Sequence, residues 1–213
     1  MTLPDDAMAQ LFNAVPANDL PSVPNFNVCP TTQIHVVRAG VSGRALVAMR
    51  WGFLPRWYKE LNGGPLLINA RSETIAEKPA FRAACRERRC LVPMSGFYEW
   101  DRSNKTEKLP WYFHRSDNTP LVCAGIWQDW EKDGQRLASC ALVTTAANKA
   151  MSTIHHRMPV VLEPADFALW LGEEGKGAAP LMCAAEENIL KFHRVTTTVN
   201  SNRAAGPELI EEI

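Results

Sequence analysis

The fold of this chain is decided by a stretch that reads LVCAGIWQDW at residues 121–130, EKDGQR at residues 131–136 and LASCALVTT at residues 137–145. Two runs rich in apolar and β-branched residues flank a short polar linker around Gly134. That is the pattern of two strands joined by a turn. We therefore expect an antiparallel pair of strands here.

Other segments repeat this strand pattern. Cys90–Trp100 and Trp111–Arg115 precede the hairpin stretch 121–145, and the polar linker Asp101–Lys108 separates them. Together with that stretch they predict successive strands of a meander. The remaining expected strands are Gln33–Ala39 and Ala45–Phe53, which form a hairpin around Gly40–Gly43, and the shorter runs Pro159–Leu162 and Arg194–Val199. Leu66–Ile68 is a short apolar run that leads to Asn69.

Helical signals are fewer and shorter. Residues 4–14 begin with a proline and two aspartates and carry an apolar stripe, which is typical of an amphipathic helix. Pro164–Leu171 also starts with proline and is followed by Gly172, a common residue after a helix end. Further helices are expected over residues 78–88, Asn148–Ser152 and Leu181–Leu190.

Strands outnumber helices, and short turns join neighbouring strands. This balance favours an α+β fold with a mostly antiparallel, partly closed sheet, a pseudo-barrel, and peripheral helices. Hydrophobic residues make up 46% of the 213 residues, enough for a sizeable core. The sequence contains no internal repeat, domain linker or low-complexity tract, so we expect one domain over residues 1–213.

The charge balance limits the possible partners. Lys and Arg total 23 and Asp and Glu total 23, so the net charge is zero. A protein that coats long duplex DNA by electrostatics alone is usually basic, so a nucleic-acid role would need a local basic cleft and stacking. The sequence has no secretory signal at its start and no apolar run of membrane-spanning length. We therefore expect a cytoplasmic protein with no membrane partner.

The cysteines predict thiols rather than disulfides or a metal site. None of the six forms a C-x-x-C pair, and no cluster has metal-ligand spacing, so neither metal nor cofactor is expected. A Gly-rich phosphate loop, a G-x-S-x-G elbow and an H-E-x-x-H pair are also missing from the sequence. A Cys–His hydrolase built on Cys29 or Cys90 stays open, although neither lies in a recognisable nucleophile setting.

Glu99 lies among aromatic residues in SGFYEW at residues 95–100. In an apolar environment, desolvation would raise the pKa of Glu99 and make it a usable acid or base near neutral pH. Strand alternation could equally point this carboxylate into solvent while the aromatic rings face the core.

Two adjacent histidines form a second candidate. His155 and His156 precede Arg157, and one of them could act as a proton shuttle. The pair could equally belong to a surface loop. On a strand the two side chains would point to opposite faces and could not chelate one metal ion together.

Asn69 and Arg71 come directly after a short apolar run. Asn69 suits a sugar or phosphate oxygen, and Arg71 can hold a phosphate with two hydrogen bonds. Alternatively, Asn69 is a turn residue and Arg71 pairs with Glu73. Upstream, WGFLPRWYK at residues 51–59 interleaves aromatic and basic residues, as base-stacking platforms do, but a hydrophobic strand end would look similar.

Seven motifs occur in a fixed order along the chain. They are NVCPT at residues 27–31, WGF at 51–53, LINARSET at 67–74, GFYEW at 96–100, TTAA at 144–147, IHHRMP at 154–159 and VN at 199–200. As a set they resemble the SRAP family (SOS-response-associated peptidase fold), also called abasic-site-processing proteins. The resemblance extends from near residue 1 to the C-terminus.

The resemblance implies covalent capture of an abasic site in single-stranded DNA. An N-terminal Cys, exposed by autoproteolytic removal of Met, attacks the ring-opened aldehyde, and its amine and thiol close a thiazolidine. By implication Glu99 moves protons, His155 assists opening of the sugar ring, and Asn69 orients the nucleophile or the sugar. The implied DNA contacts are phosphates at Arg71, Thr144 and Arg157, and a stacking wall at Trp51 and Trp100.

The start of the chain departs from the family. There the sequence begins Met-Cys-Gly-Arg-Phe, whereas Thr2 comes directly after Met1 here and no such segment occurs. Residues 2–6 resemble the residues that come after that segment in the family. We expect either a start at an internal Met or a natural member without the nucleophile. In both cases this polypeptide should not form the thiazolidine.

The sequence leaves three hypotheses on function. The first is an abasic-site crosslinking protein of the DNA damage response, acting as a monomer on single-stranded DNA and associated with the bacterial nucleoid while it acts. The second is a non-covalent binder of single-stranded DNA or junctions. The third is a Cys-dependent peptidase that acts in trans.

Overall fold

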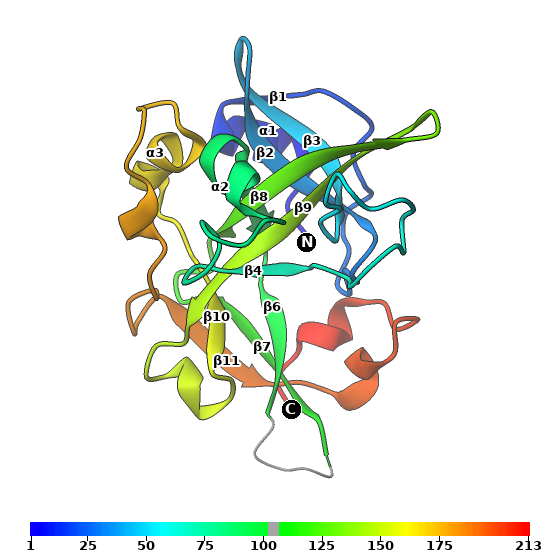
Figure 1. Ribbon diagram of the computed structural model, residues 1–213. Helices are drawn as coiled ribbons and strands as arrows, with labels where there is room; N and C mark the ends of the chain where they lie inside the picture. Colours follow the sequence, from blue (N-terminus) through cyan, green and yellow to red (C-terminus); the bar gives the residue numbers. More distant parts are fainter. Residues whose placement is uncertain (102–106) are drawn as a thin grey trace.

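The computed structural model describes residues 1–101 and 107–213, and its centre is a closed ring of β-strands (Figure 1). The ring strands are β2 (Gln33–Gly40), β3 (Gly43–Trp51), β5 (Arg89–Met94), β8 (Leu121–Lys132) and β9 (Gln135–Ala146). Neighbours pair antiparallel in the order β3–β2–β5–β8–β9, and β3 pairs with β9 in parallel to close the ring. The α+β fold with a mostly antiparallel, barrel-like sheet expected from the sequence is confirmed, and the parallel β3–β9 pair closes the sheet that was expected to be partly closed.

The stretch that decides the fold forms the β8–β9 hairpin. Its register runs from Gly125 opposite Leu142 to Lys132 opposite Gln135. The turn residues Asp133 and Gly134 have φ values of 50° and 78°, a conformation that suits the twist of a hairpin. The predicted linker Asp101–Lys108 falls largely on residues 102–106, which lie outside the described part of the chain.

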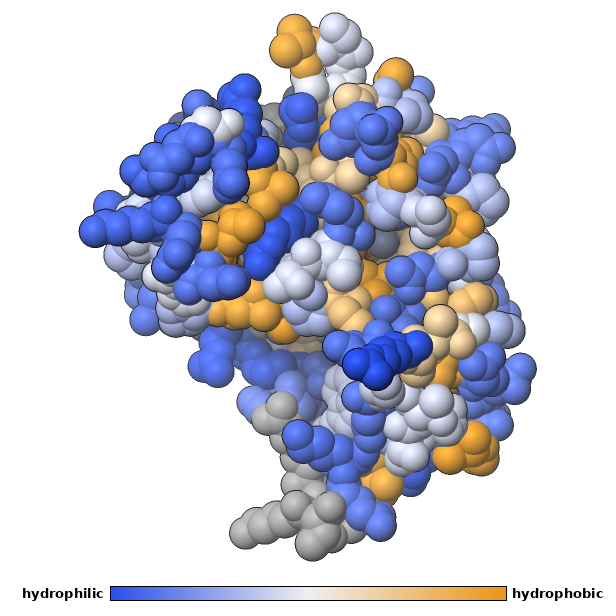
Figure 2. Space-filling model, turned by 90° about the vertical axis from the view of Figure 1, so that its right-hand side faces the viewer, coloured by the Kyte–Doolittle hydropathy of each residue, from blue (hydrophilic) through white to orange (hydrophobic). Residues whose placement is uncertain are grey.

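Helices cover the outside of the ring. They are α1 (Asp5–Phe12), α2 (Arg82–Glu87) and α3 (Phe167–Leu171), and the short strand β1 (Ala14–Pro16) comes after α1. Phe12 and Trp170 are fully buried and pack with Leu46 and Leu91 of the ring in the largest apolar cluster. Hydrophilic residues cover much of the face seen in Figure 2, with apolar groups between them. No described helix is long and apolar enough to cross a membrane.

A second, smaller sheet explains why Cys90–Trp100 is not one strand. β5 ends at Met94, and β6 (Phe97–Asp101) joins β7 (Leu109–Arg115) and β11 (Leu190–Arg194) in a separate three-stranded sheet. The chain turns between the sheets at Gly96. A Cβ atom there would lie 2.4 Å from the Phe113 carbonyl oxygen, so only glycine fits.

Two predictions for the C-terminal region were wrong. The expected helix Leu181–Leu190 consists of the 3-10 helix η3 (Ala179–Leu181) followed by turns. The Asn148 side-chain amide donates a hydrogen bond to the Ala185 carbonyl oxygen at 3.1 Å. This bond competes with the backbone hydrogen bonds of a helix. The expected strand Arg194–Val199 is replaced by the end of β11 and by the 3-10 helix η4 (Thr197–Asn200), because the Thr196 side chain accepts the Thr198 N–H and caps η4.

Two short strands flank the end of β9. β4 (Asn69–Arg71) pairs with it in parallel, and β10 (Arg157–Pro159) pairs with it antiparallel. β10 therefore begins two residues before the expected strand Pro159–Leu162, and the 3-10 helix η1 (Met151–Thr153) precedes it. The helix prediction at 164–171 corresponds to η2 (Pro164–Asp166) followed directly by α3. The last short helix is η5 (Pro207–Ile210).

Candidate functional site

One pocket, with a volume of about 750 Å³, lies between the end of the ring and the small sheet. Its walls come from β4, β9 and β10 on one side, β6 on the other, and from residues 21–30 and 199–202. All eight side chains singled out in the sequence line it: Trp51, Asn69, Arg71, Glu99, Trp100, Thr144, His155 and Arg157.

Glu99 and His155 meet across this pocket. The distance from Glu99 Oε1 to His155 Nδ1 is 3.5 Å, and the side chains are 25% and 10% exposed. Glu99 comes from β6, whereas His155 lies in the segment that leads into β10. His155 Nδ1 also lies 3.0 Å from the Arg157 carbonyl oxygen, which fixes the imidazole ring. A carboxylate and an imidazole in this arrangement can exchange a proton.

The two histidines are not arranged as a strand would place them. The rings of His155 and His156 have centroids 4.6 Å apart at an interplanar angle of 45°. Both residues precede β10 and are not in a strand, so the alternation considered for a strand does not apply to them. Within residues 1–101 and 107–213, no three His, Cys, Asp or Glu side chains are grouped so as to hold a metal ion.

Sheet register sets the positions of Asn69 and Arg71. β4 runs along β9 with Asn69 opposite Leu142 and Arg71 opposite Thr144. Asn69 and Arg71 are exposed while Ala70 between them is fully buried, as strand alternation requires. The Trp51 indole N–H donates to the Ile68 carbonyl oxygen at 3.1 Å, which ties β3 to the start of β4.

The Arg157 guanidinium is held by hydrogen bonds to Glu73 and Thr144. Its Nη1 and Nη2 donate to the two Glu73 carboxylate oxygens at 2.6 and 2.9 Å, and Nη2 also donates to the Thr144 carbonyl oxygen at 2.8 Å. The Arg157 hydrogen bonds lower the pKa of Glu73 to about 2. The alternative pairing of Arg71 with Glu73 was therefore wrong.

No hydrogen bond or ion pair joins the Arg71 side chain to a described residue, so its guanidinium is available to a ligand.

The first residues of the chain also reach the pocket. The Thr2 N–H donates to Ser95 Oγ at 3.0 Å, and the Met1 α-amine donates to the Asn25 carbonyl oxygen. Partial burial lowers the pKa of that amine. Cys29 lines the same pocket and donates its S–H to the Asn27 carbonyl oxygen at 3.6 Å.

Sequence reasoning missed the contribution of the C-terminal segment. The Trp100 indole N–H donates to Asn200 Oδ1 at 2.6 Å, and the Tyr98 hydroxyl donates to the Phe26 carbonyl oxygen at 2.8 Å. Asn27 Nδ2 donates to the carbonyl oxygens of Ser201 and Ala204, each at 3.0 Å. The motifs at residues 27–31 and 199–200 were visible in the sequence, but nothing in them indicated that Asn27 bonds the residues that come after the second motif.

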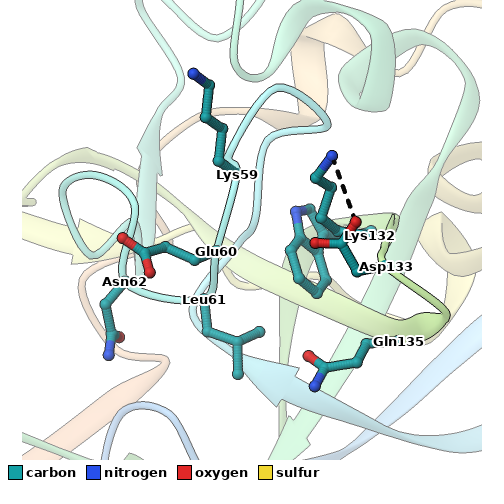
Figure 3. Close-up of a pocket in the computed structure, with 8 residues that line it drawn as sticks. Lys59, Glu60, Leu61, Asn62, Lys132, Asp133 and Gln135 are labelled. Carbon is teal, nitrogen blue, oxygen red and sulfur yellow. Dashed lines mark ion pairs between the residues drawn. The ribbon is translucent and has the colours of Figure 1, made fainter.

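A second hollow of about 340 Å³ lies beside the β8–β9 turn (Figure 3). Lys132 pairs there with Asp133 at 3.7 Å, and the Trp130 indole N–H bonds the Tyr58 carbonyl oxygen at 2.8 Å. None of the eight predicted residues lines it. Within the candidate platform at residues 51–59, Trp51 lines the larger pocket, whereas Trp57 is 58% exposed.

Comparison with known proteins adds the family relationship. The chain matches the family described as SOS response associated peptidase (SRAP) over residues 1–202. It is 33% identical to abasic site processing protein YoqW of Bacillus subtilis, with 88% of this chain and 86% of YoqW covered. It is 34% identical to abasic site processing protein YoaM of the same organism, covering 88% and 85% of the two chains. A crystal structure of a Bordetella bronchiseptica protein superposes with a TM-score of 0.79 at 24% identity, over 92% of this chain and 97% of that one.

Proposed function

This chain belongs to the SOS response associated peptidase (SRAP) family, and from that premise we propose that it processes abasic sites in single-stranded DNA. The observation that carries the proposal is the gathering of all eight predicted residues on one pocket. An abasic nucleotide offers an aldehyde, sugar oxygens and flanking phosphates. The pocket offers a carboxylate and an imidazole in contact, an arginine with no ion-pair partner among the described residues, and two half-buried tryptophans.

In the proposed reaction, the α-amine of an N-terminal Cys adds to the aldehyde of the ring-opened sugar. Water leaves to form an imine, and the Cys thiol adds across the C=N bond to close a thiazolidine, with no oxidant or reductant. Glu99 gives and takes the protons of these steps, and assists hydrolysis that removes the preceding Met. His155 passes a proton to the sugar oxygen as the ring opens, and its 3.5 Å separation from Glu99 supports exchange between the two.

The proposed DNA contacts divide by chemistry. Arg71 binds a phosphate next to the lesion, and Thr144 lies opposite it on β9. Trp51 and Trp100 stack against neighbouring bases, which requires bases that are not already paired and so favours single-stranded DNA. Asn69 orients the sugar or the attacking amine.

The position of Thr2 supports entry of the nucleophile from the start of the chain. Thr2 is bonded to Ser95, so a Met-Cys-Gly-Arg-Phe segment placed ahead of it would begin at the pocket that Glu99 and Asn69 also line. The chain as given has Met1 instead of that segment. We propose the covalent step for a chain in which that Cys is N-terminal.

The test is a crosslinking assay on a form in which Met-Cys-Gly-Arg-Phe replaces Met1. Incubation with a labelled single-stranded oligonucleotide that carries one abasic site should give a slower band on a denaturing gel. The same form with Ser in place of that Cys, and undamaged DNA, should give none. If the Cys form yields no adduct although it is folded, the covalent proposal is wrong.

A non-covalent role is the second candidate, and the available guanidinium of Arg71 favours it for the chain as given. This chain should bind the abasic oligonucleotide more tightly than undamaged DNA in a fluorescence anisotropy titration. A peptidase that uses Cys29 has less support. That thiol donates its hydrogen to a backbone carbonyl, and no hydrogen bond joins it to an imidazole of the described residues.

Three further proposals concern the domain organisation, the oligomeric state and the location of the protein. We propose that residues 1–213 form one domain and that the protein acts as a monomer. We also propose a cytoplasmic location, with association to the nucleoid while it acts on damaged DNA. Sedimentation of the free protein and of its complex with the oligonucleotide tests the oligomeric state.

A further inference from the structure

Trp100 is bonded to a side chain from a distant part of the sequence. Its indole N–H donates to Asn200 Oδ1 at 2.6 Å, and both residues line the pocket. The indoles of Trp51, Trp130 and Trp170 instead donate to backbone carbonyl oxygens. The orientation of Trp100 therefore depends on an acceptor that a single substitution can remove.

The backbone around Asn200 is held in place, and the Asn200 side chain itself is exposed. This residue ends η4, whose first turn is capped by Thr196, and the neighbouring Val199 is buried against Tyr112. Two hydrogen bonds from Asn27 to the carbonyl oxygens just beyond Asn200 anchor the same segment to the 21–30 loop. The backbone that carries the acceptor for the Trp100 indole is thus held by contacts that do not involve Trp100.

Stacking requires that an aromatic face be presented in a defined direction. Trp100 is half-buried, so part of its ring faces open space, and Asn200 limits rotation of that ring by holding its edge. A ring that is fixed before the ligand arrives loses less conformational freedom on binding. We propose that Asn200 is a positioning residue that orients the Trp100 indole for stacking on the nucleotide beside the lesion, an inference that rests on the proposed function.

The first test examines the free protein. A two-dimensional ¹H–¹⁵N spectrum of a chain with seven tryptophans shows their indole N–H signals, and Trp100→Phe identifies the one from Trp100. Asn200→Ala should move that signal upfield as its hydrogen bond is lost, while the other indole signals stay in place. Asn188→Ala, which alters an exposed amide away from the pocket, is the matched control and should move none of them. An unmoved Trp100 signal in Asn200→Ala overturns the proposal.

The second test measures binding of a single-stranded oligonucleotide with a stable tetrahydrofuran abasic analogue by fluorescence anisotropy. Asn200→Ala should weaken binding about two- to tenfold, the range of one hydrogen bond. In the Trp100→Phe background, which keeps an aromatic ring but lacks the N–H donor, Asn200→Ala should have no further effect. Independent, multiplying effects of the two substitutions would overturn the positioning role.

A further variant separates this inference from the proposed function. Trp100→Ala should weaken binding about tenfold, as loss of one stacking partner does. If the parent chain binds, Trp100→Ala weakens binding and Asn200→Ala does not, the positioning role alone fails. If the parent chain does not bind the oligonucleotide, the proposed function fails, while the indole signal still reports whether Asn200 holds Trp100.

Discussion

The two walls of the pocket are built in different ways. The ring wall is defined by Asn69, Arg71, Thr144 and Arg157. Each of these side chains projects from β4, β9 or β10, and β4 and β10 each pair with the end of β9. On the small-sheet wall, defined by Glu99 and Trp100, β6 pairs only with β7 among the described strands. Side-chain contacts of Glu99 with His155 and of Trp100 with Asn200 add constraints there.

Under the proposed function, the two walls would suit different roles. Backbone pairing fixes the position of the Cα atom that carries a charged side chain, and this is sufficient for contact with a phosphate. Proton transfer and stacking require finer control of a side chain, and hydrogen bonds from other segments provide it. Substitutions on the small-sheet wall should therefore change chemistry and orientation, whereas substitutions on the ring wall should change affinity and its dependence on salt.

The largest effect is expected from Glu99→Gln in the form that carries the N-terminal Cys. Loss of a general acid or base should slow adduct formation about 100-fold or more. Affinity for the oligonucleotide with the stable tetrahydrofuran analogue should stay within a factor of about two. Rates come from quenched time points on denaturing gels. Glu174→Gln, at an exposed carboxylate away from the pocket, is the control and should react at the parent rate. Equal losses in rate and affinity would place Glu99 among the binding groups instead.

Arg157→Ala should have the next largest effect, and on two properties at once. The substitution removes a bidentate ion pair and a bond to the Thr144 carbonyl, and leaves the Glu73 carboxylate without this partner in the ring wall. We expect DNA binding to weaken about tenfold and the free energy of unfolding to fall by about 1 kcal/mol. Adding Glu73→Gln should restore part of both losses. No restoration would mean that repulsion by Glu73 is not the cause.

Local patterns were sufficient to predict much of the fold. The stretch 121–145 became the β8–β9 hairpin because its turn residues and its flanking strands all act within 25 residues of each other. The split of Cys90–Trp100 into two sheets was not predictable in the same way. It depends on the lack of room at Gly96 beside Phe113, and that neighbour is defined only once β6 and β7 have paired.

The site residues, like the fold, could be predicted from local motifs, but their distant contacts could not. The eight residues were found through motifs that are contiguous in the sequence, and all of them reached one pocket. Their partners were not found. Glu73 pairs with Arg157, which is 84 residues away, rather than with nearby Arg71, and the bond from Trp100 to Asn200 spans 100 residues. Single-sequence reasoning carries no information about contacts at that separation.

Arg71→Ala tests the other arginine of the ring wall and should have a smaller effect. Because Arg71 has no ion pair to lose in the described structure, the free energy of unfolding should not change. Affinity for the single-stranded analogue should fall about fivefold, and the slope of log K against log salt should decrease by about 0.7, the value for one phosphate contact. Anisotropy titrations at several salt concentrations measure both. An unchanged slope would show that Arg71 does not bind a phosphate.

The smallest effect concerns Glu73 and the pH dependence of stability. Pairing with Arg157 lowers the pKa of Glu73 from 4.5 to about 2 in the folded protein, so the pair contributes fully above pH 4.5 and its contribution is lost as the pH falls through 2. The Glu73 side chain is 48% exposed, and solvent screening should keep the contribution below about 1 kcal/mol. Glu73→Gln cannot titrate. The difference in unfolding free energy between the parent and this variant, measured in urea from pH 6 to pH 2, should therefore shrink on acidification, while carboxylates elsewhere, such as Asp117 beside Arg115, cancel from that difference. A difference that stays constant over this range would mean that the Glu73–Arg157 pair orients Arg157 without stabilising the ring wall.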